Sequence, residues 1–219
     1  MGSGGVFALS REKGVYLAEA MWTWFAPVAN QVKSWLDCGL IGDVVDVRTN
    51  YHLDVQHYAP RLLDPAVAGG AVLDSGVYPI TYLYRLFGKP VRVKCIGTLR
   101  DGVDIREDVE LTFENGRTFL ASISIVDFDG GETMEIRGTK GTIRIPSFHA
   151  TDRAFLDREG EEPLCFCAEG SILHEMDLAA AEIRKGLVES RYVPALATLD
   201  VMHIMDECRA QMGLTYPFE

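Results

Sequence analysis

The hydrophobic residues of this chain follow two spacings, which divide it into predicted strands and helices. From residue 44, apolar or weakly polar side chains alternate with polar ones, as in a half-buried strand; they are Val45, Val47, Thr49, Tyr51 and Leu53. The alternation resumes over residues 91–166, interrupted by turn sequences at 114–117, 138–141 and 157–160. Three successive hairpin connections predict antiparallel strands with one apolar face and one polar face. The polar face carries Arg48, Arg92, Glu110 and Arg144.

Helical spacing occupies most of the remaining chain. It predicts helices over residues 6–13, 27–38 and 74–87, each followed by a glycine, and a short buried strand over residues 15–18. Two stripes near the C-terminus predict two further helices that cover the apolar face of the sheet; they are Met176, Ala180, Ile183 and Leu187, then Val201, Met205, Cys208 and Met212. This order predicts an α+β fold with an open, mainly antiparallel β-sheet covered by helices on one face, and no doubly wound Rossmann domain.

Composition and charge narrow the class of partner. The 219 residues carry 21 basic and 32 acidic side chains, a net charge of −11, with the basic residues scattered. We therefore expect neither nucleic acid nor a membrane surface as a partner, and no apolar run approaches the roughly 20 residues of a membrane-spanning helix. The five cysteines are odd in number and mostly lie in apolar surroundings, which predicts buried reduced thiols and a cytoplasmic protein.

The N-terminal residues call for a separate interpretation. Residues 1–5 read as an added linker, residues 6–14 as a residual helix, and residues 15–219 as the folded domain. Gly2-x-Gly4 begins like a dinucleotide-binding fingerprint, but Phe7 stands where the third glycine belongs and no strand precedes it. We therefore expect no nucleotide-binding turn in this segment.

The candidate chemistry lies at the start of the predicted helix over residues 74–87. Asp74 and Tyr78 are four residues apart, which places both side chains on one helical face. A carboxylate and a phenol at this spacing can share a small polar substrate, the phenol transferring a proton and the carboxylate orienting a hydroxyl. The spacing alone also fits a helix-capping aspartate followed by a tyrosine at the edge of the core.

Four separated motifs occur in one order; they are EAMWTWFAP at 19–27, GLIGDV at 39–44, GGAVLDSGVYPI at 69–80 and GLTYP at 213–217. Their combination resembles the glucose-fructose oxidoreductase/inositol dehydrogenase (Gfo/Idh/MocA) family, and within it the dihydrodiol dehydrogenase-like branch. The resemblance runs from about residue 15 to the end. It implies an NAD(P)-dependent dehydrogenase with an N-terminal Rossmann domain and a C-terminal α+β domain whose open sheet mediates oligomerisation.

The resemblance also assigns roles to residues. Asp74 and Tyr78 match the family's catalytic aspartate and its tyrosine or histidine, and Trp22 could line the substrate pocket, although a buried aromatic residue is an equal interpretation. The family's lysine comes from a Glu-Lys-Pro motif that this chain lacks, and Trp24 stands where the branch often has arginine. We expect the Rossmann domain to be absent, since only about 14 residues precede the matching region.

Two functions follow as hypotheses. The first is the substrate-binding and oligomerisation domain of an NAD(P)-dependent dehydrogenase that oxidises a hydroxyl of a sugar or cyclic diol, inactive alone and acting as a homodimer through the sheet face. NAD or NADP would serve the parent enzyme, with none bound to this chain. The second is a non-catalytic dimerisation or small-ligand-binding module. No metal site is expected, because neither His203 with Glu207 nor Cys165 with Cys167 has further ligands.

Overall fold

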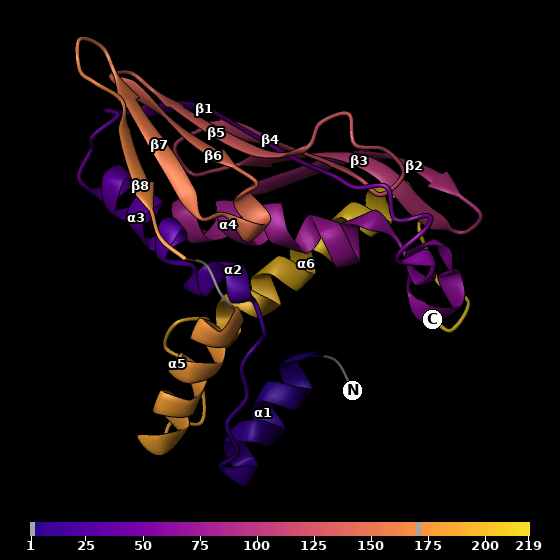
Figure 1. Ribbon diagram of the computed structural model, residues 1–219. Helices are drawn as coiled ribbons and strands as arrows, with labels where there is room; N and C mark the ends of the chain where they lie inside the picture. The colour runs from indigo at the N-terminus through magenta and orange to yellow at the C-terminus, as the bar shows by residue number, and fades with distance from the viewer. Residues whose placement is uncertain (1–2, 170–171) are drawn as a thin grey trace.

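The computed structural model describes residues 3–169 and 172–219, which form one large sheet with helices beneath it (Figure 1). The strands are β1 (Val44–His52), β2 (Arg92–Arg100), β3 (Val103–Thr112), β4 (Thr118–Ser124), β5 (Glu132–Gly138), β6 (Gly141–Pro146), β7 (Arg153–Arg158) and β8 (Leu164–Cys167). The α-helices are α1 (Ser3–Lys13), α2 (Trp22–Phe25), α3 (Pro27–Asp37), α4 (Val77–Phe87), α5 (Ile172–Arg184) and α6 (Ala195–Met212). Short helical turns are η1 (Pro60–Leu63), η2 (Pro65–Val67), η3 (Val72–Gly76) and η4 (Phe148–Ala150). The α+β prediction is confirmed.

The eight strands lie in the order β2-β3-β4-β1-β5-β6-β7-β8. Every neighbouring pair is antiparallel except β1 and β4, which are parallel, with Arg48 opposite Leu120. The parallel pair arises because β1 enters the sheet between the β2–β4 meander and the β5–β8 meander. The three predicted hairpins join β3 to β4, β5 to β6 and β7 to β8.

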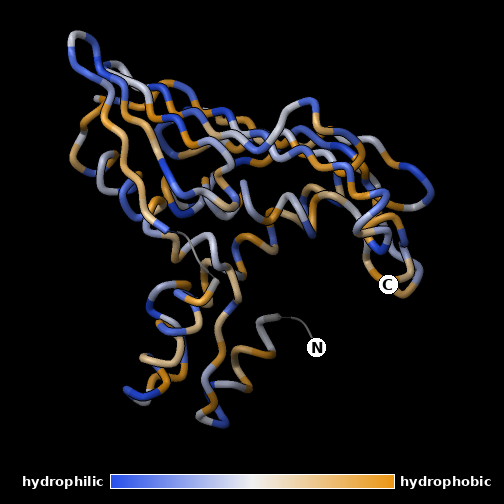
Figure 2. Tube along the Cα trace, in the orientation of Figure 1, coloured by the Kyte–Doolittle hydropathy of each residue, from blue (hydrophilic) through white to orange (hydrophobic). Residues whose placement is uncertain are grey.

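The alternation of residue types follows the two faces of the sheet. Along β1, Val47, Thr49 and Tyr51 are buried, whereas Arg48 is exposed on the opposite face. The strand tubes in Figure 2 change between hydrophilic and hydrophobic colours in the same way. Helices α3, α4 and α6 lie beneath the buried face, and the other face has no helix over it among the described residues (Figure 1). No helix in the described part of the chain is both long and apolar enough to cross a membrane.

Several local predictions were wrong. Residues 15–18 form no strand; Leu17 makes one isolated bridge with Glu189, and Val15 is exposed. Helix α1 begins at Ser3, three residues before the start of the helix predicted over residues 6–13. Helix α5 does not cover the sheet, because it lies apart from it (Figure 1) and exposes Met176 and Ile183.

The cysteine prediction holds only in part. All five cysteines are free, but only Cys95 and Cys208 are buried. Cys165 and Cys167 lie on the edge strand β8, where strand pairing shields one side only, and Cys38 follows the end of α3.

Candidate active site

The segment that carries Asp74 is a single π-helical turn, η3, that runs directly into α4. Two glycines precede it because no larger residue fits. A Cβ at Gly69 would lie 2.7 to 2.8 Å from three backbone carbonyl oxygens, and Gly70 has a φ of +132°. Asp74 makes no capping hydrogen bond, so the capping interpretation was wrong. The wider turn is a feature often found at functional sites.

Asp74 and Tyr78 line one hollow of about 370 Å³ at the end of the sheet. The hollow is formed by the end of β1, the loop after it, the η3–α4 segment, the start of β5 and η4. Its lining residues are Tyr51, Leu53, Val55, Tyr58, Ala59, Arg61, Leu62, Asp74, Tyr78, Glu132 and His149. The size suits a small ring-shaped ligand.

Aromatic rings surround the Tyr78 phenol. The ring of His149 stands edge-on to that of Tyr78, with their centroids 4.3 Å apart. Tyr51 lies 4.9 Å from the His149 ring and 5.7 Å from the Tyr78 ring. The ring centroid of Trp22 lies 4.9 Å from that of His149, and Trp22 also hydrogen-bonds to Tyr78. Contacts from three separate parts of the chain therefore fix the position of Tyr78.

The Asp74 carboxylate has a charged partner on the open side of the hollow. Arg61 Nη2 donates to Asp74 Oδ1 at 2.9 Å, and the arginine side chain is largely exposed. An exposed ion pair of this kind contributes only about 0–1 kcal/mol to stability. Asp74 can therefore exchange Arg61 for a ligand hydroxyl at small cost.

Burial sets the protonation states around the hollow. Burial, together with the negative charge of Asp74, raises the pKa of Tyr78 above its ordinary 10.0, although a hydrogen bond from Trp22 opposes the shift. Burial lowers the pKa of His149 to about 4 and raises the pKa of Glu132. At neutral pH the site therefore holds a protonated phenol beside a neutral imidazole. Tyr78 is suited to donate a proton, and it would need a nearby cation to accept one.

The structure brings Asp74 and Tyr78 together as predicted. Trp22 is not among the residues that line the hollow, but it hydrogen-bonds to the Tyr78 phenol and packs against His149. Sequence reasoning missed Tyr51, Arg61, Glu132 and His149. Tyr51 stood in an alternating strand and looked like core, and His149 lies 71 positions beyond Tyr78. The Pro-rich stretch around Arg61 had no pattern that marked it. No cluster of potential metal ligands occurs in residues 3–169 and 172–219.

Comparison with known proteins agrees with the fold. The family model of the GFO/IDH/MocA C-terminal domain matches residues 29–144. The trans-1,2-dihydrobenzene-1,2-diol dehydrogenases of Mus musculus and Homo sapiens are 32% and 30% identical to the chain, each over 96% of it. The chain spans 66% of the length of each of these relatives. A 3-ketoreductase from Actinomadura kijaniata, solved with NADP and TDP-benzene, has the same fold; its TM-score is 0.83 at 22% identity, covering 96% of this chain and 66% of its own.

The chain belongs to the GFO/IDH/MocA family, as a C-terminal domain. Within the family it falls in the dihydrodiol dehydrogenase-like branch.

Proposed function

We propose that this chain is the substrate-binding and oligomerisation domain of an NAD(P)-dependent oxidoreductase that acts on a hydroxyl of a cyclic diol or sugar. The observation that carries the proposal is the convergence of Asp74 and Tyr78 on one ring-sized hollow. The relatives support the substrate class, because the two mammalian proteins are named for a cyclic vicinal diol. The free thiols fit a cytoplasmic setting.

Tyr78 would transfer the proton and Asp74 would orient the substrate. In the reducing direction the phenol, kept protonated by burial, donates its proton to the developing alkoxide. In the oxidising direction it must accept the hydroxyl proton, which requires a cation to lower its pKa. Asp74, one helical turn before Tyr78, accepts a hydrogen bond from a substrate hydroxyl in place of the one from Arg61. The nicotinamide, when bound, supplies or accepts the hydride.

The described residues fit the substrate side of such a site and not the pyrophosphate of the cofactor. A glycine pair precedes the η3 turn, as in a phosphate-binding loop, but the Val72 N–H already donates to the Asp104 carboxylate at 2.6 Å. An anion in this position excludes a phosphate. We therefore expect a separate nucleotide-binding domain to hold NAD or NADP, with none retained by this chain alone.

The surface for that domain would lie along α1 and the segment after it. Val6, Leu9 and Val15 are exposed there and line an apolar hollow of about 280 Å³. Figure 1 shows α1 and α5 projecting from the side of the molecule away from the sheet. Exposed apolar surfaces of this kind are typical of domain contacts.

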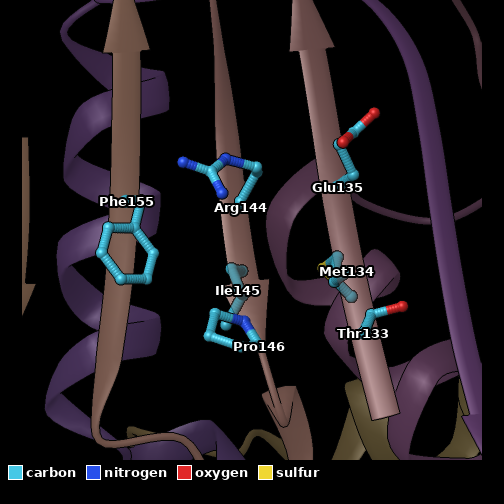
Figure 3. Close-up of a pocket in the computed structure, with 7 residues that line it drawn as sticks. All are labelled: Thr133, Met134, Glu135, Arg144, Ile145, Pro146 and Phe155. Atoms are coloured by element: carbon cyan, nitrogen blue, oxygen red, sulfur yellow. The ribbon is translucent and has the colours of Figure 1, made fainter. Parts of the chain in front are cut away.

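The open face of the sheet supports the proposed homodimer. Charges of opposite sign alternate across it, as where Arg48 and Arg144 both lie opposite Glu135. Glu135 and Arg144 also line a hollow of about 400 Å³, whose lining residues are drawn in Figure 3; Arg144 lies over the ring of Phe155 there. A charged and partly apolar face of this kind can pair with a second copy about a two-fold axis.

The test uses the complete gene product, including any nucleotide-binding domain encoded upstream in frame. We expect NADP- or NAD-dependent oxidation of a cyclic trans-diol, and loss of this activity in Tyr78→Phe. The alternative, a non-catalytic ligand-binding or dimerisation module, would be supported if no such domain is encoded and the chain binds a cyclic diol with no turnover. It would also be supported if Tyr78→Phe left the activity unchanged.

A further inference from the structure

Two buried carboxyl groups lie directly beneath the turn that carries Asp74. Asp104 and Glu107 belong to β3 and are 0% and 1% exposed. Asp104 Oδ2 accepts a hydrogen bond of 2.6 Å from the backbone N–H of Val72, the first residue of η3. The start of the π-turn is therefore fixed by a side chain 32 positions away in the sequence.

Both ends of the η3 turn lie close to the carboxyl groups of Asp104 and Glu107. A Cβ at Gly70 would lie 2.0 Å from Asp104 Oδ1, and a Cβ at Gly76 would lie 3.6 Å from Glu107 Oε1. Glycine is thus required at position 70, and Glu107 lies against the last residue of η3. Tyr216 adds a third tie, because its hydroxyl donates to the Gly69 carbonyl oxygen at 2.6 Å.

The pair lacks the donors that two carboxylates would need. Asp104 Oδ1 and both Glu107 oxygens are buried with no hydrogen-bond partner, and neither residue forms an ion pair among the described residues. No cation lies among the described titratable groups around the pair. Cys95 on β2, Cys208 on α6 and Tyr216 in the C-terminal segment lie near it, whereas the neighbouring Asp108 is exposed on the opposite face of β3. Two buried like charges without a cation are strongly unfavourable, so one proton must be retained.

Glu107 is the member that retains the proton. Burial and the negative charge of Asp104 raise its pKa well above its ordinary value of 4.5. Burial also raises the pKa of Asp104, but the hydrogen bond from the Val72 N–H opposes that shift, as does the bond that Glu107 donates once it is protonated. The acid proton of Glu107 thus serves as the missing donor to Asp104.

We propose that Asp104 and Glu107 are positioning residues that share one proton and hold the η3 turn so that Asp74 stays beside Tyr78 in the hollow. This inference rests on the proposed function of Asp74. It predicts a direction of pH dependence. The stabilisation is fully present below the ordinary pKa of a glutamic acid and is lost as the pH rises through the raised pKa of Glu107, because the second negative charge then repels Asp104.

The first experiment uses the 219-residue chain and needs no enzymatic activity. Infrared spectra of protein labelled with ¹³C-glutamate should show, at pH 7, the C=O band of a buried protonated carboxyl group. The band should persist in Glu110→Gln, which removes an exposed glutamate from the same strand, and disappear in Glu107→Gln. A wild-type spectrum with no such band, or a band unchanged in Glu107→Gln, overturns the proposal.

Hydrogen exchange tests whether the shared proton holds the turn. Glu107→Gln keeps a donor to Asp104 at every pH, so its protection factors at residues 71–76 should match wild type at pH 7 and stay constant as the pH rises, where those of wild type fall. Glu107→Leu removes the donor and should lower this protection on the order of tenfold or more. If the protection factors of wild type and Glu107→Gln depend on pH in the same way, the proposal is contradicted. This comparison can be made even if Glu107→Leu fails to fold.

Kinetics in the complete enzyme separate this inference from the proposed function. Glu107→Leu should lower kcat about 10- to 100-fold through misplacement of Asp74, leave the KM of the cofactor near its wild-type value, and be rescued by Glu107→Gln. Lost protection without a change in kcat overturns the positioning role. A wild-type enzyme that turns over no diol or sugar instead refutes the proposed function, whatever the infrared and exchange results.

Discussion

The Gly70→Ala substitution tests the packing of the η3 turn independently of any enzymatic activity. Gly70 has a φ of +132°, a conformation that alanine adopts only under strain, and the added Cβ would lie 2.0 Å from Asp104 Oδ1. Asp104 would have to move, and the hydrogen bond to the Val72 N–H would be lost with it. The substitution therefore combines backbone strain with an unpaired buried polar group.

These two effects set the expected magnitude. Strained backbone of this kind costs about 1–3 kcal/mol, and leaving a buried polar group unsatisfied costs about 1–3 kcal/mol more. The sum is about 2–6 kcal/mol of unfolding free energy. For a domain of this size, each kcal/mol lowers Tm by about 2–4 °C, so we expect Gly70→Ala to melt roughly 4–24 °C below wild type.

Gly116→Ala is the matched control for this experiment. Gly116 also has a positive φ, +77°, but a Cβ there would meet nothing within 4 Å. The Gly116→Ala substitution should therefore lower the free energy of unfolding only by the backbone strain, about 1–2 kcal/mol. Thermal unfolding followed by circular dichroism measures both variants. If Gly70→Ala melted at the same temperature as Gly116→Ala, the contacts between the η3 turn and Asp104 would contribute nothing to stability, and the packing argument would be refuted.

Three further outcomes are expected. Calorimetric titration of the 219-residue chain with NAD(H) or NADP(H) should show no saturable binding, because the Val72 N–H after the glycine pair already donates to the Asp104 carboxylate; micromolar affinity would be contrary evidence. Light scattering should give twice the 24.3 kDa chain mass, and a monomer throughout the micromolar range would exclude the dimer. The free energy of unfolding should fall as the pH drops from 6.5 towards 4, by about 3 kcal/mol at most, because the pKa of His149 is about 4 in the folded protein and 6.5 when unfolded. In urea titrations at several pH values, His149→Gln should flatten this pH dependence. An unchanged pH dependence in the variant would show that His149 is not the cause.

The strands and the acid–phenol pair were predictable because local patterns determine them. Alternation over β1 follows from one face being buried, and Asp74 and Tyr78 share a helical face through their spacing of four. Helix α5 was placed wrongly for a physical reason. Its stripe has helical spacing, but an amphipathic pattern does not say which surface the apolar side contacts.

The remainder of the site depends on contacts between distant parts of the chain. The π-turn at 72–76 is held by Asp104, and nothing in residues 69–80 indicates that partner. The ring of His149 reaches Tyr78 only because η4 follows β6, whose own position depends on the register of β5. Such contacts are fixed by the packing of the whole domain and leave no periodic signal in the sequence.

The comparison of kcat between wild type and Tyr78→Phe in the complete enzyme tests the central claim most directly. Phenylalanine keeps the ring that packs against His149 and removes only the hydroxyl group that transfers the proton. At saturating diol and cofactor, kcat should fall by about 10² to 10⁴, the usual contribution of a general acid or base, while Tm and cofactor affinity stay unchanged. A variant that retains nearly full kcat would show that Tyr78 has only a structural role and would contradict the account.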